Sequence, residues 1–157
     1  MTYDTNNVSL FLNIKYSLAA RGSDIMKLIT RDTDYSIRAL VYIARNKDRI
    51  ISITELVKEL GTPRPFLRKI LQLLSTNGVL KSYKGKNGGF ELAQKPEELC
   101  LLDLMEIFQG KFKLSECLFK KKICPNQISC KLKAQLDSLE ELVENKVKEI
   151  TLASLLE

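Results

Sequence analysis

The sequence predicts a mainly α protein with a small β wing, in which a winged helix-turn-helix domain precedes a long C-terminal dimerisation helix. Three observations lead to this fold class. Two short amphipathic helical patterns lie in succession within residues 52–76, a glycine-rich hairpin pattern follows at 79–93, and an apolar seam with helical spacing runs through 132–150. A chain of 157 residues can bury one core but not two large ones.

We expect four segments along the chain. Residues 1–25 show no sustained period and precede Met26, the expected natural start, so we interpret them as a disordered or non-native leader. The winged helix-turn-helix domain is expected at 26–110 and a cysteine-bearing loop at 111–130. The dimerisation helix and a C-terminal turn are expected at 131–157.

The first two helices of the domain have recognisable beginnings. The first is expected from Asp32, and Asp34 shares its first turn, where the helix dipole favours carboxylates. In the second helix, Ser52 and Glu55 have the spacing of a capping box, and Gly61 is expected to end the helix. The apolar residues of this second helix recur at helical spacing and are Ile53, Leu56, Val57 and Leu60.

The third helix begins directly after a short turn. Thr62 is expected to cap it, and its first turn tolerates Pro63 and Pro65 because amides there lack intrahelical partners. One face of this helix is apolar and contains Phe66, Leu67, Ile70, Leu71 and Leu74. The other face is polar and mostly cationic and contains Arg64, Arg68, Lys69 and Gln72.

A β-hairpin is expected after the third helix. Asn77 and Gly78 stop that helix, and residues 79–84 then have the composition of a strand. The turn is expected at 85–89 and the return strand at 90–93. In a winged helix the second helix of the helix-turn-helix enters the major groove of DNA and the hairpin contacts the backbone or minor groove. The alternative is a solvated basic helix beside an ordinary hairpin. The candidate DNA-binding residues are Thr54, Arg64, Arg68, Lys69, Gln72, Lys84, Lys86, Asn87 and Gly88.

The charge distribution favours a polyanionic partner. Residues 26–93 contain 13 basic and 6 acidic side chains, whereas residues 134–157 contain 2 and 6, within a total net charge of +6. No apolar run approaches the ~20 residues of a membrane span, and no export signal is evident, so we expect a cytoplasmic protein. The chain has no histidine, phosphate-binding glycine loop or nucleophile elbow, which argues against an enzyme.

The segment after the hairpin contains a short helix and then a long one. The short helix is expected at 102–108, with Gly110 after it, and Cys100 is expected to be a buried structural thiol. The long helix has an apolar seam made of Leu132, Leu136, Leu139, Val143, Val147 and Ile150. Its length suggests a homodimer; the alternative is that it folds back on its own head. Thr151 is expected to cap a final turn.

Three further cysteines occur close together at Cys117, Cys124 and Cys130. Thiolates suit iron–sulfur clusters, zinc and Cu(I), and the spacing alone does not choose among them. The closely paired cysteines typical of a zinc site are absent from the sequence. Because the chain has no histidine, a fourth ligand would be a carboxylate, Cys100, water or a group from another subunit. Unligated thiols are the remaining alternative.

Taken together, residues 26–156 resemble the IscR/NsrR family of bacterial winged-helix regulators. The hairpin turn and the cysteine triplet are the most specific parts of the resemblance. The matching motifs are Met26-Lys27-Leu28, Asp34-Tyr35-Ser36-Ile37-Arg38-Ala39-Leu40, Asn77-Gly78-Val79, Lys84-Gly85-Lys86-Asn87-Gly88-Gly89-Phe90, Leu101-Leu102-Asp103, the three cysteines and Thr151-Leu152-Ala153.

This resemblance implies a homodimer that binds a double-stranded DNA operator and holds a 4Fe-4S or 2Fe-2S cluster through Cys117, Cys124 and Cys130. In the nitric-oxide-sensing branch the fourth ligand is an aspartate from the other subunit, and Asp34 occupies the matching position. The expected function is a DNA-binding transcriptional regulator controlled by that cluster. The alternative is a cluster-free thiol-switch or zinc-stabilised regulator of the same fold.

Overall fold

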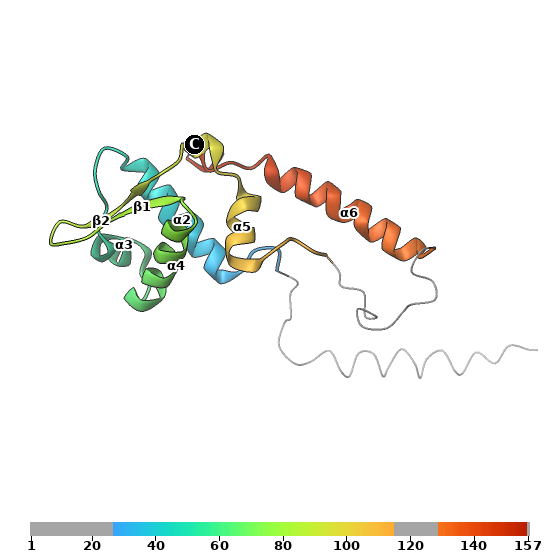
Figure 1. Cartoon of the computed structure of the whole chain (residues 1–157), viewed down its shortest axis with the longest axis horizontal. Helices are drawn as coiled ribbons and strands as arrows, with labels where there is room; N and C mark the ends of the chain where they lie inside the picture. The colour runs from blue at the N-terminus through green and yellow to red at the C-terminus, as the bar shows by residue number, and fades with distance from the viewer. Residues whose placement is uncertain (1–26, 115–128, 157) are drawn as a thin grey trace, which may run out of the picture.

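The computed structural model describes residues 27–114 and 129–156, which form a head of packed helices with a two-stranded wing and one projecting helix (Figure 1). This arrangement confirms the predicted fold class. With the labels of Figure 1, the head contains α2 (Arg31–Arg45), α3 (Ile53–Leu60), α4 (Arg64–Thr76), β1 (Leu80–Tyr83), β2 (Gly89–Leu92), η1 (Pro96–Glu98) and α5 (Leu101–Gln109). The remaining elements are α6 (Lys131–Lys148) and the short turn η2 (Ala153–Leu155). The predicted leader lies outside the described residues.

The helix-turn-helix consists of α3 and α4. Ser52 caps α3 by accepting a hydrogen bond from the backbone N–H of Glu55, and Gly61 ends it at φ 59°, a left-handed conformation that favours glycine. The expected cap of α4 is wrong, because Pro63 occupies the N-cap position. Thr62 is instead buried and donates its hydroxyl to the carbonyl of Leu60 at 3.0 Å, inside the turn.

The wing is an antiparallel pair of strands with Leu80 opposite Leu92 and Tyr83 opposite Gly89. Both strands begin within one residue of their predicted starts. A bridge between Ile51 and the return strand ties the wing to the segment before α3, through two backbone hydrogen bonds of 3.0 and 2.9 Å with Phe90. The wing is therefore fixed to the same helix-turn-helix that it flanks.

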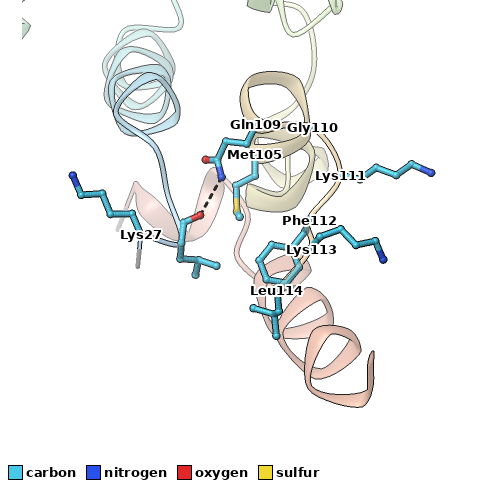
Figure 2. Close-up of a pocket in the computed structure, with 9 residues that line it drawn as sticks. Lys27, Met105, Gln109, Gly110, Lys111, Phe112, Lys113 and Leu114 are labelled. Atoms are coloured by element: carbon cyan, nitrogen blue, oxygen red, sulfur yellow. Dashed lines mark hydrogen bonds between the residues drawn. The ribbon is translucent and has the colours of Figure 1, made fainter. Parts of the chain in front are cut away.

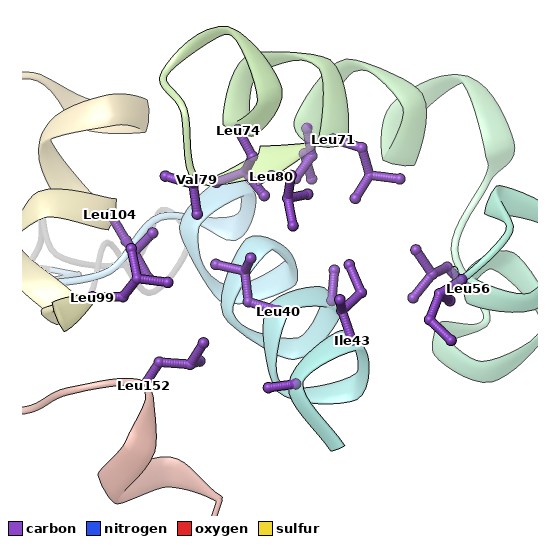
Figure 3. Close-up of a cluster of buried hydrophobic side chains, with 14 of the residues drawn as sticks. Leu40, Ile43, Leu56, Leu71, Leu74, Val79, Leu80, Leu99, Leu104 and Leu152 are labelled. Carbon is purple, nitrogen blue, oxygen red and sulfur yellow. The ribbon is translucent and has the colours of Figure 1, made fainter. Parts of the chain in front are cut away.

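One hydrophobic core joins the head helices, the wing and the C-terminal segment (Figure 3). Leu152, near the end of the chain, is 1% exposed in this core. Its backbone N–H donates to Leu99 at 2.8 Å, and the backbone N–H of Leu101 donates to the carbonyl of Ile150 at the same distance. The C-terminal end of α6 is thereby anchored to the head. The largest buried side chains include Leu40, Ile43, Ile51, Leu56, Leu67, Ile70, Leu71, Leu74 and Leu104.

The long helix α6 packs on the head at its C-terminal end only. Val147 is buried with Leu101, Leu102 and Met105 of α5. Farther toward its N-terminus, α6 projects away from the head (Figure 1) and leaves large apolar side chains exposed, namely Leu132, Leu139 and Leu142. The alternative that α6 folds back on its own head therefore holds only for its last turns.

Two smaller expectations have different outcomes. The predicted cap, Thr151, lies one residue before Leu152, the N-cap of η2, and its hydroxyl accepts a hydrogen bond from the backbone N–H of Ser154. Cys100 is only half-buried, since it lies in a bridge with Thr151 at the edge of the core, which corrects the predicted burial. Partial burial still raises the pKa of its thiol. None of the described helices has the length and hydrophobicity needed to span a membrane.

Candidate nucleic-acid interface and metal ligands

The exposed face of α4 gathers the candidate base-contacting residues. Its apolar face is fully used by the head, because Leu67, Ile70, Leu71 and Leu74 are each at most 1% exposed. That packing turns the opposite face to solvent, and all four polar candidates on it are exposed: Arg64, Arg68, Lys69 and Gln72. The helix therefore presents a cationic ridge with arginines suited to bidentate hydrogen bonding.

The wing tip has a tight turn that only glycine permits. The backbone N–H of Gly88 donates to Gly85 at 3.1 Å, and a Cβ on Gly88 would lie 2.2 Å from the carbonyl oxygen of Tyr83. Lys84, Lys86 and Asn87 are exposed on this turn. The tip thus brings two ammonium groups and an amide to the end of a short hairpin.

A network of side chains stabilises the beginning of α3, where Thr54 is exposed. Arg49 donates two hydrogen bonds to the carboxylate of Glu55, and the Tyr42 hydroxyl donates a third at 2.8 Å. The hydrogen bonds from Arg49, followed by that from Tyr42, lower the pKa of Glu55 to about 2. Hydrogen bonding to the same carboxylate raises the pKa of Tyr42. The Glu55 side chain therefore joins three segments of the head instead of completing a capping box with Ser52.

A cavity of about 210 Å³ lies between the C-terminal end of α5 and the segment before α2 (Figure 2). Gln109, the last residue of α5, lines it. Its Oε1 accepts hydrogen bonds from the backbone N–H of Thr30 at 2.9 Å and the hydroxyl of Thr33 at 2.7 Å. Its Nε2 donates to the carbonyl of Leu28 at 3.1 Å. One amide thus holds the beginning of α2 against α5.

Asp34, the expected ligand from a second subunit, lies in the first turn of α2. Its carboxylate accepts a hydrogen bond from Nε of Arg38 at 3.0 Å, and its side chain is 48% exposed. That pairing raises the pKa of Arg38. A carboxylate with this exposure is accessible to a partner, and an ion pair on the surface is weak enough to be exchanged for a metal.

Of the three clustered cysteines, Cys117 and Cys124 lie outside the described residues, and Cys130 is placed at the N-cap of α6. The half-buried sulfur of Cys130 accepts a hydrogen bond from the backbone N–H of Lys133 at 3.4 Å. Within the described ranges no three His, Cys, Asp or Glu side chains converge on a possible metal position. The N-terminal end of α6 lies far from α2 in the same chain (Figure 1), so Cys130 and Asp34 of one subunit are not brought together.

The segment that leads toward the cysteines is fixed along α6. Phe112 packs in the cluster around Val147, and the backbone N–H of Leu114 donates to the carboxylate of Glu140 at 3.1 Å. Lys113 pairs with the same carboxylate and lowers the pKa of Glu140. No sequence pattern indicated either Glu140 or Gln109, because each is a single polar residue whose partner is remote in the chain.

Comparison with known proteins places this geometry in a family. Residues 29–157 match the family model Rrf2, described as an iron-dependent transcriptional regulator. A helix-turn-helix transcriptional regulator of Aquifex aeolicus is 40% identical over 90 residues, which cover 57% of this chain and 62% of that protein, less than two thirds of its length. The regulator NsrR of Shouchella clausii is 29% identical over 131 residues, or 79% of this chain and 88% of NsrR.

Solved structures agree in fold. IscR of T. potens has a TM-score of 0.64 at 21% identity and covers 86% of this chain and 89% of its own. CymR, the global cysteine regulator of B. subtilis, has a TM-score of 0.67 at 18% identity, with 83% and 97% covered. The family and these curated relatives are transcriptional regulators, not enzymes. With a matching family model over most of its length and the winged-helix architecture described above, the chain belongs to the Rrf2 family of DNA-binding transcriptional regulators.

Proposed function

We propose that this regulator binds its operator as a homodimer and that an iron–sulfur cluster, 4Fe-4S or 2Fe-2S, controls the binding. The observation on which the cluster depends is the set of donors. Three thiols lie within 14 residues, one of them at the N-terminus of the projecting helix, in a chain whose family is described as iron-dependent.

On DNA, α4 is the recognition helix. Its exposed ridge of Arg64, Arg68, Lys69 and Gln72 enters the major groove, where arginine and glutamine distinguish bases through bidentate hydrogen bonds. The wing residues Lys84, Lys86, Asn87 and Gly88 meet the backbone or the minor groove, and Thr54 meets a phosphate at the beginning of α3.

The dimer forms through α6. Leu132, Leu139 and Leu142 are 69%, 47% and 59% exposed within one subunit, and an apolar stripe of this size normally marks an interaction surface. The side chains beside Leu139 and Leu142 include the uncharged Gln135, Ser138 and Asn145, with Glu141 at the edge. Lys146, one turn after Leu142, pairs with Glu149. A second copy can therefore cover the leucines with little burial of charge. Two α4 helices then lie on half-sites about 34 Å apart.

The cluster is held by Cys117, Cys124 and Cys130, with Asp34 of the partner subunit as the fourth ligand. Thiolates are the usual ligands of such iron. To bind the iron, the carboxylate of Asp34 has to release its ion pair with Arg38. When bound, the cluster supplies an iron centre that responds to nitric oxide, redox state or iron–sulfur supply. Asp34 lies in the first turn of α2, and its neighbour Tyr35 contacts Phe66 of α4 edge to face, with ring centroids 5.5 Å apart. A displacement of Asp34 on binding the cluster would therefore act close to the recognition helix.

Anaerobic purification of cysteine variants tests the cluster. Wild-type protein is expected to be brown and to contain iron and sulfide, and Cys130→Ala is expected to lose both. Cys100→Ala is the matched control, because Cys100 lies at the edge of the head core and is not a proposed ligand. Colourless wild-type protein without iron or zinc would favour a thiol switch. Colourless protein with zinc would favour a structural metal.

The proposed cross-subunit ligand has its own control on the same helix. Asp34→Ala is expected to shift the visible absorption spectrum and to speed cluster loss in air, whereas Asp32→Ala removes a carboxylate from the same helix turn without those effects. Equal spectra and equal lifetimes for the two variants would exclude Asp34 as a ligand. Footprinting of cluster-loaded and cluster-free protein on its own upstream region then measures how the cluster changes operator binding.

A further inference from the structure

Arg31, the first residue of α2, lies beside the recognition helix. Its guanidinium carbon lies 5.3 Å from the ring centroid of Phe66 and 5.5 Å from that of Tyr35, and the two rings meet edge to face at 87°. The nearby carboxylate of Asp34 does not neutralise it, because Asp34 pairs with Arg38. Arg31 is exposed, so its charge faces solvent.

The two aromatic rings restrict where this charge can go. Cation–π contacts of about 0.5–1 kcal/mol at exposed sites favour a guanidinium over the ring faces, and a stacked guanidinium still directs its N–H groups outward in its own plane. Phe66 lies in the first turn of α4, between Arg64 and Arg68. The stack therefore places a positive charge next to the N-terminal end of the recognition helix, which is the end that approaches base edges in helix-turn-helix proteins.

We infer that Arg31 contacts a DNA phosphate at the edge of the groove that α4 enters, held in place by Tyr35 and Phe66. We favour a phosphate over a base because Phe66 is half-buried between α4 and α2. This position of Phe66 keeps the guanidinium of Arg31 to one side of the exposed ridge of α4, and not between that ridge and the bases. Planar guanidinium groups bind phosphate oxygens bidentately. This inference rests on the DNA docking of α4 proposed above.

The test compares Arg31→Gln with Arg45→Gln, which removes the same charge from an exposed position at the other end of α2. The probes are the duplex that full-length wild-type protein selects from a randomised pool and a scrambled duplex of equal length, each titrated at several salt concentrations. For Arg31→Gln we expect the dissociation constant to rise by a similar factor on both duplexes. The slope of log K against log salt is expected to fall by about 1 for each phosphate that is no longer neutralised. Arg45→Gln is expected to leave both quantities unchanged.

Further variants separate the stack from the charge. Arg31→Lys is expected to keep the wild-type salt slope with weaker binding, because the ammonium keeps the charge but cannot stack as a plane. Phe66→Leu is expected to reduce the effect of Arg31→Gln in a double-mutant cycle. An Arg31→Gln protein with unchanged slope and affinity would overturn the inference, and so would weakening confined to the selected duplex, which would indicate base contact. If Arg64→Ala abolishes binding while Arg31→Gln does not weaken it, the docking of α4 survives and only the role of Arg31 is rejected.

Discussion

The helices α4 and α6 are both amphipathic, yet they use their apolar faces differently. In α4, 13 residues long, four leucine and isoleucine side chains are buried in the head. In α6, 18 residues long, Val147 is the one fully buried side chain, and three leucines are exposed. A face that is satisfied within its own chain leaves the opposite face free for function, whereas an unsatisfied face needs a partner. This difference favours a polar ligand for α4 and a protein for α6.

The charges on the two helices support the same division. The exposed ridge of α4 is cationic, which suits a polyanion. The exposed stripe of α6 is apolar and bordered mostly by uncharged side chains, and the acidic residues of α6 lie mainly on its other sides. One subunit therefore has two separate surfaces, and we propose that one binds nucleic acid and the other a second copy. Substitutions on the two helices should separate folding from assembly.

The largest effect is expected in the core of the head. Leu71→Ala removes a side chain that is 0% exposed and leaves a cavity in the head core, which should lower the free energy of unfolding by about 2–5 kcal/mol. Urea denaturation followed by circular dichroism measures it. Gln72→Ala, the next residue on the exposed face, is the matched control and should change stability by less than about 0.5 kcal/mol. Similar destabilisation of both variants would mean that α4 does not pack as described.

A smaller effect, and of a different kind, is expected on α6. Leu139→Ser removes an exposed leucine from each copy, and at about 1 kcal/mol per copy the dimer dissociation constant should rise roughly 30-fold. Sedimentation over a range of concentrations measures this constant, while urea denaturation of the monomer should show little change. Glu144→Ser, on the opposite side of the same helix, should leave assembly intact. A monomeric wild-type protein would remove the homodimer from the proposal.

Much of the fold could be predicted because its signals are local. The period of the apolar residues in α3 and α4, the cap at Ser52, the stop at Gly61 and the glycine-rich wing turn each depend on a few neighbouring residues. The exposure of Arg64, Arg68, Lys69 and Gln72 followed from the same period, since an apolar face that packs turns the other face to solvent.

The features that the sequence did not predict depend on remote partners. Leu152 enters the head core from the end of the chain, and Gln109 binds residues about 80 positions earlier. Glu55 was expected to bind Ser52 reciprocally, but a bidentate arginine is a stronger partner than one backbone N–H, so Arg49 takes its carboxylate. No local pattern encodes such pairings.

Gln109 provides a test of how firmly α2 is held to α5. Gln109→Ala removes three hydrogen bonds to the beginning of α2, one of them from the buried hydroxyl of Thr33, and should cost about 1–2 kcal/mol in the free energy of unfolding. Gln94→Ala removes one exposed hydrogen bond from a side-chain amide to the carbonyl of Gly78. It should lower the free energy of unfolding by less than about 0.5 kcal/mol. Urea denaturation of both variants distinguishes them. Equal costs would show that the Gln109 bonds contribute no more than a surface contact.

The smallest expected effect is the pH dependence from Glu55, in the network that joins α2, the segment before α3 and α3 itself. It is small because solvent screens the ion pair with Arg49, whose side chain is 51% exposed. Its pKa is about 2 in the folded protein against an ordinary 4.5, so the unfolded chain binds its proton more readily. The network therefore stabilises the fold above about pH 4.5, and this contribution is lost progressively as the pH falls toward 2. The melting temperature of Glu55→Gln should change less with pH than that of wild type across this range. Glu59→Gln, one turn along α3, should show the same pH dependence as wild type. If Glu55→Gln and wild type lose stability in parallel on acidification, the contacts of Glu55 with Arg49 and Tyr42 do not cause the loss of stability at low pH. The position of α3 would then depend on its buried leucine instead.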